Sequence, residues 1–199
     1  MKKLLKPLAL LILMTSVSSC MAVRSDKYLA VTPEELKVTS SKKSKIFIDW
    51  GFDSSFFGQT GQSTINKLKS DQKRILNDVI VESNCCEIVN EKEEANIFIN
   101  GAFHNDSSNA SLVFAMITGF SMYIIPSWGN SKMRVSAKVE NGKISKEYDL
   151  NDSMLFAQWL PFIVVPIFAG NQIKVEGEVN KNLYKTLLAQ IKKDGFFGK

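Results

Sequence analysis

The fold of this chain is decided by residues 132–150, which read KMRVSAKVENGKISKEYDL. Apolar and polar residues alternate on both sides of Asn141-Gly142, and such alternation is typical of strands with one buried face. Asn-Gly is a strong signal for a two-residue hairpin turn of type I′, because both residues of that turn type adopt positive φ. The stretch therefore predicts a β-hairpin in a sheet that exposes one face to water.

The turn also predicts a register, because a two-residue loop fixes which residues lie opposite each other. Lys146 is the exception on the apolar side, and we expect its ammonium group to reach out to the edge of the sheet. The predicted apolar pairs are Met133 with Leu150, Val135 with Tyr148 and Val139 with Ile144, and the polar pairs are Arg134 with Asp149 and Glu140 with Lys143.

Outside the hairpin, the hydrophobic periodicity predicts further strands and two helices. The strands are expected at 45–50, around 86–89 and at 96–104, and the helices at 63–82 and 172–193. The predicted fold class is α+β, with a small, mainly antiparallel sheet, a helix in the N-terminal half and a C-terminal helix.

Two uncharged segments flank the hairpin, residues 107–131 and 153–173. Their apolar centres, 112–126 and 154–169, fall short of the roughly 20 residues that a membrane-spanning helix needs. We expect them to pack on the sheet or to lie at a membrane surface, with spanning helices and the strands of an oligomeric pore as alternatives. The expected membrane or partner contacts are Phe114, Ile117, Phe120, Tyr123, Trp128, Trp159, Phe162 and Phe168.

The N-terminus predicts export and lipid attachment. Residues 1–19 combine three lysines with the apolar run Leu8–Met14 and small residues before Cys20, which is the pattern of a signal peptide. The stretch Val17-Ser18-Ser19-Cys20 resembles the bacterial lipobox, in which the cysteine sulfur receives lipid and cleavage occurs before the cysteine. The resemblance implies that Cys20 carries lipid, such as palmitate, as the first mature residue.

The mature chain is expected to comprise a lipidated tether, residues 20–44, and a single α+β domain, residues 45–195. Three of the 25 Lys and Arg residues lie within 1–19 and none of the 20 Asp and Glu residues do, so the mature net charge is only +2. This balance does not favour a nucleic-acid partner. Cys85 and Cys86 are expected to be unpaired thiols, with a strained vicinal disulfide as the alternative, and adjacent cysteines alone do not form a metal site.

The sequence favours a binding module over an enzyme. His104 is the single histidine and lies just beyond the apolar part of an expected strand, where a surface position is more common than a catalytic one. No Gly-x-Ser-x-Gly motif is present, and the loop from Gly58 to Ser63 lacks the lysine of a phosphate-binding loop. We therefore expect no catalytic residues, cofactor or metal, and the sequence identifies no small-molecule substrate.

A longer resemblance covers about residues 95–192. The segment Ile117–Ser127 ending in Ile-Pro-Ser, the Asn-Gly hairpin, the Trp159-Leu160-Pro161-Phe162 segment and the helix around Asn182–Leu188 resemble a group of bacterial envelope lipoproteins without an assigned activity. This resemblance implies an envelope lipoprotein and no particular reaction. Met21 follows the lipobox cysteine where an aspartate would signal retention, which implies the outer membrane, facing the periplasm.

The functional hypothesis is therefore a lipid-anchored, non-enzymatic lipoprotein that acts as a binding or accessory module at the membrane surface. Its expected partners are the membrane, through the N-terminal lipid, and an envelope protein. The alternatives are a subunit of an oligomeric membrane pore or translocation assembly, and a two-helix integral membrane protein.

Overall fold

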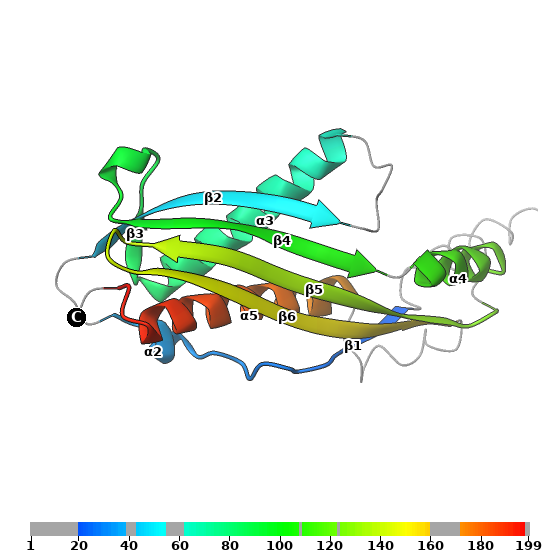
Figure 1. Ribbon diagram of the computed structural model, residues 1–199. Helices are drawn as coiled ribbons and strands as arrows, with labels where there is room; N and C mark the ends of the chain where they lie inside the picture. The colour runs from blue at the N-terminus through cyan, green and yellow to red at the C-terminus, as the bar shows by residue number, and fades with distance from the viewer. Residues whose placement is uncertain are drawn as a thin grey trace, which may run out of the picture. The chain divides into compact units, whose positions relative to one another are not determined.

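The structure is a computed structural model (Figure 1), and it describes residues 20–38, 43–54, 62–107, 109–122, 124–159 and 172–197. The expected signal peptide, residues 1–19, lies outside the described part of the chain. Three of the expected contact residues, Tyr123, Phe162 and Phe168, lie outside it as well.

The structure confirms an α+β fold. The described residues form six strands in one continuous sheet and four α-helices. The strands are β1 (Cys20–Arg24), β2 (Ser44–Ser54), β3 (Cys86–Ile88), β4 (Ile97–Ser107), β5 (Ser127–Glu140) and β6 (Ser145–Gln158). The helices are α2 (Pro33–Leu36), α3 (Gln62–Ser83), α4 (Asn109–Phe120) and α5 (Gln172–Lys193), and a 3₁₀ turn covers Lys92–Glu94.

The sheet is larger and more mixed than the small, mainly antiparallel sheet that we expected. It has six strands in the order β1-β6-β5-β4-β2-β3. β2 runs parallel to both β3 and β4, whereas β1 runs antiparallel to β6. The parallel pairing arises because α3 carries the chain from β2 back to the start of β3, as a crossover connection between parallel strands requires.

The chain divides into two compact units. The first unit comprises Met1–Ser25, Ser107–Lys132 and Ser153–Glu178, and the second comprises Asp26–Asp106, Met133–Asp152 and Val179–Lys199. The ends of the long strands β5 and β6 belong to the first unit, and their hairpin ends belong to the second. The single domain expected for residues 45–195 stays a prediction.

The core of the second unit lies between one face of its strands and the helices α3 and α5, which run along the same side of the strands (Figure 1). Trp50 of β2 contacts Tyr184 of α5 edge to face, with ring centroids 5.6 Å apart. The Tyr184 hydroxyl donates to Gln72 Oε1 of α3 at 2.8 Å, and burial raises the pKa of Tyr184. Other nearly fully buried residues are Ile46, Ile48, Leu76, Val79, Ile97, Ile99, Phe103, Met133, Val135, Val139, Leu183 and Leu187.

The hairpin has the predicted faces but not the predicted register. Asn141 N donates to Ile144 O at 3.1 Å, so the tight turn is centred on Gly142-Lys143 instead of Asn141-Gly142. Gly142 has a φ of 78°, whereas Asn141 is not among the residues with positive φ. A glycine with positive φ at the first turn position is typical of a type II′ turn.

The change of turn moves the pairing by two residues, which leaves each side chain on its predicted face because strand side chains alternate with a period of two. Val135 and Tyr148 are buried as predicted. Ile144, expected on the apolar side, is 44% exposed, and Glu140 pairs with Lys138 at 2.7 Å instead of with Lys143.

The expected tether is structured over most of its length. Cys20–Arg24 forms the edge strand β1. In the second unit, Val31 N donates to Asn182 Oδ1 of α5 at 3.2 Å, and Lys192 Nζ donates to Glu35 O and Lys37 O at 2.7 and 2.6 Å. Leu36 of the same segment is buried as well, but a single apolar residue in a polar stretch shows no periodicity from which this docking could be predicted.

Cys85 and Cys86 form a vicinal disulfide, whereas we expected two unpaired thiols. Our expectation treated the two residues as neighbours in one strand, with side chains on opposite faces. Cys85 instead precedes β3 and follows Asn84, which has a left-handed φ of 51°. Strand alternation therefore does not separate the two sulfur atoms.

Candidate functional site

The first unit carries a short uncharged helix, α4, in which Thr118 and, directly after the helix, Ser121 turn their hydroxyl groups to the local backbone. Thr118 Oγ1 donates to Phe114 O at 2.9 Å, and Ser121 Oγ donates to Thr118 O at 3.0 Å. Met122 follows with a φ of 52° and takes the chain out of the helix. Because these hydroxyl groups bond within the helix, the outer surface of α4 is left to its apolar side chains.

A group of large apolar side chains is exposed on α4 and on the segments next to it in the first unit. Phe120 is 89% exposed, Trp128 67% and Phe114 53%. Exposed patches of this kind are typical of surfaces that meet a partner or a membrane. We call the following residues the apolar cluster: Val113, Phe114, Met116, Ile117, Phe120, Met122, Ile124, Ile125, Trp128 and Trp159.

Two contacts connect the parts of the apolar cluster. The rings of Phe114 in α4 and Trp128 in β5 are stacked, with centroids 6.5 Å apart and an interplanar angle of 13°. Trp159, directly after β6, donates its indole N–H to Ile124 O at 3.2 Å. The cluster is therefore assembled from α4, the connection after it, the start of β5 and the end of β6.

The lipobox cysteine lies beside this cluster. β1 pairs antiparallel with β6, and the register places Cys20 opposite Gln158, the residue before Trp159. Ser25 N further along donates to Ser153 O at 2.9 Å and extends the pairing. Cys20 and Trp159 thus lie at the same end of the β1–β6 pair, within one compact unit.

The structure brings together five of the eight predicted contact residues: Phe114, Ile117, Phe120, Trp128 and Trp159 are exposed members of the apolar cluster. Burial on the sheet was one of two placements expected for the first apolar segment, and Phe114, Ile117 and Phe120 of α4 are 42–89% exposed. In the second segment, Met154 and Phe156 are buried on β6, and residues 160–171 lie outside the described part. Sequence reasoning missed five members, Val113, Met116, Met122, Ile124 and Ile125, although the uncharged run contained them all.

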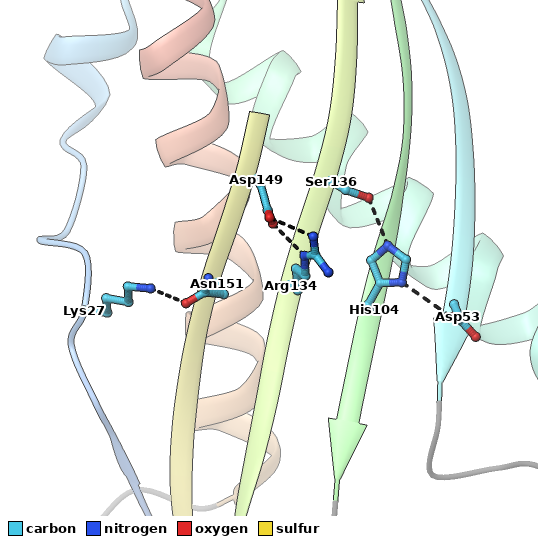
Figure 2. Close-up of polar contacts among 7 residues, drawn as sticks. All are labelled: Lys27, Asp53, His104, Arg134, Ser136, Asp149 and Asn151. Atoms are coloured by element: carbon cyan, nitrogen blue, oxygen red, sulfur yellow. Dashed lines mark hydrogen bonds and ion pairs between the residues drawn. The ribbon is translucent and has the colours of Figure 1, made fainter. Parts of the chain in front are cut away.

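In the second unit, polar side chains line a hollow of about 640 Å³. Figure 2 shows the labelled side chains on the side of the strands away from the helices. Three acidic and three basic residues line the hollow, so its charge does not favour ligands of either sign. These six are Asp49, Glu147, Asp149, Lys69, Arg134 and Lys138.

Two ion pairs lie on this polar face, Arg134 with Asp149 and Lys138 with Glu140. Arg134 donates to both carboxylate oxygens of Asp149, at 2.6 and 2.7 Å. The bidentate hydrogen bond from Arg134 lowers the pKa of Asp149. Likewise, the ammonium group of Lys138 lowers the pKa of Glu140. Paired, exposed charges are typical of a solvated sheet surface.

The structure also brings together an aspartate, the histidine and a serine, which we did not predict (Figure 2). Asp53 and His104 are cross-strand partners on β2 and β4, and His104 Nδ1 lies 3.5 Å from Asp53 Oδ2. His104 Nε2 lies 2.9 Å from Ser136 Oγ on β5. The sequence separation of these three residues conceals the arrangement, because only the strand order makes them neighbours.

The Asp53–His104–Ser136 arrangement has the connectivity of a catalytic triad but not its surroundings. A triad also needs amide donors aimed at the developing oxyanion. Ser136 lies within β5, which has strand neighbours on both sides, so the amides around it point along the sheet toward those strands. Asp53 is also 76% exposed. The arrangement is therefore suited to orienting the His104 ring on the surface.

The described residues hold no cluster of three metal-ligating side chains. Within the same residues, no helix combines the length and the apolar character needed to cross a bilayer. α4 itself has 12 residues.

No family model and no curated protein matches the chain. Two solved structures of PelC dodecamers from Paraburkholderia phytofirmans are similar over 85% of this chain and 95% of the PelC chain. A single-residue PelC variant is 9% identical with a TM-score of 0.32, and a second PelC structure is 8% identical with a TM-score of 0.30. A likeness at this level carries no argument about this chain.

Proposed function

We propose that this chain is a lipid-anchored lipoprotein of the bacterial envelope, a non-enzymatic binding or accessory module held at the membrane surface by Cys20. It is expected at the outer membrane, facing the periplasm. The proposal is supported above all by the place of Cys20, which begins β1 and lies opposite Gln158 in the unit that exposes the apolar cluster.

This arrangement gives the lipid attachment a structural consequence. A lipid on the first residue of an edge strand holds the folded unit directly at the leaflet, because no flexible tether intervenes between Cys20 and the sheet. Several acyl chains at one residue make such anchoring stable, whereas one chain gives only marginal binding. The end of the sheet that carries Cys20 is therefore expected to stay at the membrane surface.

The polar face of the second unit supports a module rather than an enzyme. Arg134 and Lys138 form ion pairs with Asp149 and Glu140, and Ser136 lies within the sheet without the surroundings of an activated nucleophile. A binding surface for an envelope partner needs neither a nucleophile nor a cofactor.

Replacing the acylated residue tests the proposal. Wild-type protein should incorporate labelled palmitate, show the mass of an acylated chain starting at residue 20, and sediment with membranes. Cys20→Ser should lose the label and either appear in the soluble fraction or remain as uncleaved precursor. A Cys20→Ser protein of normal mature mass that still sediments with membranes contradicts the proposal.

The other two cysteines provide a matched control. The double variant Cys85→Ser/Cys86→Ser removes the buried vicinal disulfide and leaves Cys20 as the single cysteine. It should incorporate palmitate like the wild type. The size of the detergent-extracted protein then separates a module from the pore alternative, since a pore requires a ring of many copies.

A further inference from the structure

We infer that the apolar cluster inserts into the same lipid leaflet that holds the acyl chains of Cys20. The inference rests on the proposed lipid anchor and names the bilayer, rather than a protein, as what covers the cluster. It assigns a membrane-binding surface to α4, the start of β5 and the end of β6.

The first argument is position. Cys20 lies opposite Gln158 in the β1–β6 pair, the next residue is Trp159, and its indole N–H is bonded to Ile124 O. The attachment point and the cluster are thus joined by a strand pairing and one hydrogen bond within a single compact unit. Acyl chains on Cys20 keep the cluster at a leaflet, so its effective concentration there is high without further affinity.

The second argument is chemical. Residues 107–131 and 153–173 carry no charge, so insertion desolvates no charged side chain there. The cluster contains two tryptophans, Trp128 and Trp159, which are enriched where a membrane protein meets the headgroup region. Lys132, directly after the first uncharged segment, is exposed and suits contact with anionic headgroups.

The third argument separates a leaflet from a protein partner. Protein interfaces typically form a hydrogen bond for every 100–200 Å² or so of contact. The hydroxyl groups of Thr118 in α4 and of Ser121 directly after it already bond to the helix backbone, and the Trp159 indole is bonded to Ile124. The cluster therefore offers a partner mainly apolar contact, which lipid accepts without geometric complementarity.

The chain contains its own probes for this contact. Its three tryptophans are Trp50, which is 1% exposed in the core of the second unit, and Trp128 and Trp159 in the cluster. Acylated full-length mature protein is reconstituted into vesicles of phosphatidylethanolamine and phosphatidylglycerol, with or without acyl chains brominated near the headgroups. We expect brominated lipid to quench the emission of Trp128 and Trp159 at least twofold.

Variants assign the signal without disturbing the core. Trp128→Phe and Trp159→Phe should each reduce the quenched fraction, and the double variant, which retains Trp50, should lose the quenching. Phe120→Ser should shift the tryptophan emission of vesicle-bound protein to longer wavelength. Leu29→Ser should leave the emission unchanged, since Leu29 is equally exposed at 89% but lies outside the cluster.

The outcomes distinguish this inference from the proposed function. Acylated protein that sediments with vesicles but shows no quenching overturns the inference and leaves the lipid anchor standing. Protein without an acyl mass refutes the anchor, and its tryptophans still decide the inference: quenching in the vesicle-bound fraction supports leaflet insertion, and its absence overturns it.

Discussion

The apolar cluster of the first unit and the polar face of the second unit differ in whether their side chains have interaction partners within the protein. On the polar face, Arg134 and Asp149 form a bidentate pair, and His104 lies between Asp53 and Ser136. In the cluster, Phe120 and Trp128 are 89% and 67% exposed and carry no charge to pair. The polar face is suited to water, whereas the cluster is left with apolar surface that water does not stabilise.

This difference indicates which surface of the chain is available for a functional contact. A face whose charges neutralise each other gives little net stabilisation and little affinity for a charged ligand. An uncharged group of aromatic and aliphatic side chains can gain free energy only by leaving water. The cluster is therefore the surface on which a functional contact is expected, and the polar face is expected to tolerate change.

The largest expected effect separates the two sides of the hairpin. Val135 is fully buried and its neighbour Arg134 is exposed. Val135→Asp places an unpaired carboxylate in the core and should destabilise the protein by more than about 4 kcal/mol, enough to unfold it. Arg134→Glu should cost far less and leave the protein folded, because it breaks only an exposed ion pair. Urea unfolding followed by circular dichroism measures both, and equal tolerance would contradict the observed facing.

A second pair compares phenylalanines of the two units. Phe103 is fully buried in β4, and Phe120 ends α4 almost fully exposed. Phe103→Ala should cost about 3–5 kcal/mol through lost burial and the cavity left behind. Phe120→Ala should change the free energy of unfolding by under about 0.5 kcal/mol, as is usual for surface substitutions. A large loss for Phe120→Ala would show that the cluster is part of a core.

These regions also differ in how well the sequence predicted them. The bounds of α5 and the buried face of the hairpin follow from local periodicity, which any stretch of sequence displays by itself. α4 was recognised only as an apolar segment, because a run of apolar residues has no periodicity that separates a helix from a buried strand. The exposure of α4 depends on whether other segments of the chain pack against it, which its own residues do not show.

What the sequence could not predict depends on pairing between distant segments. β1 has five residues and lies at the edge of the sheet, and its own pattern is too short to distinguish it from a tether. The meeting of Asp53, His104 and Ser136 requires the parallel register of β2 with β4 and the neighbouring position of β5. The turn register failed because Asn141-Gly142 is compatible with more than one loop, and the local pattern does not choose between them.

A third prediction compares a glycine of each unit. A Cβ at Gly101 of β4 would lie 2.5 Å from Ser136 O and 2.7 Å from the Trp50 ring, whereas a Cβ at Gly177 of α5 would meet nothing within 4 Å. Gly101→Ala should therefore destabilise the protein by about 1–3 kcal/mol through overpacking. Gly177→Ala should stabilise it by up to about 1 kcal/mol, since alanine favours helix.

Thermal and urea unfolding of the two glycine variants measures both signs. A neutral Gly101→Ala would mean that β4 and β5 can separate without cost at this point. The close approach of the Trp50 ring to Gly101 of β4 would then not limit the size of the residue at position 101.

The smallest expected effect concerns pH and the end of α5. Lys146 Nζ lies 2.8 Å from Asp194 Oδ2, and the Tyr148 hydroxyl donates to the same oxygen at 2.7 Å. The hydrogen bond from Lys146, followed by that from Tyr148, lowers the pKa of Asp194 below its ordinary value of 3.8. Asp194 is a carboxyl group with a lowered folded pKa, so its contribution to stability is present above the unfolded pKa. This contribution is lost as the pH falls through the folded pKa.

Asp194→Asn should therefore lose less stability than the wild type when the pH is lowered from about 6 to about 2, with a difference under about 1 kcal/mol because the pair is partly exposed. Urea midpoints measured across that range report the difference.

Lys146→Met and the double variant Lys146→Met/Asp194→Asn complete a double-mutant cycle. The destabilisations of the two single variants should not add in the double variant, since both changes break the same contact. Tyr148→Phe should retain most of the pH dependence, because Lys146 is the larger cause of the lowered pKa. Additive effects of the Lys146 and Asp194 changes would mean that the ion pair does not hold the end of α5 to the hairpin in solution.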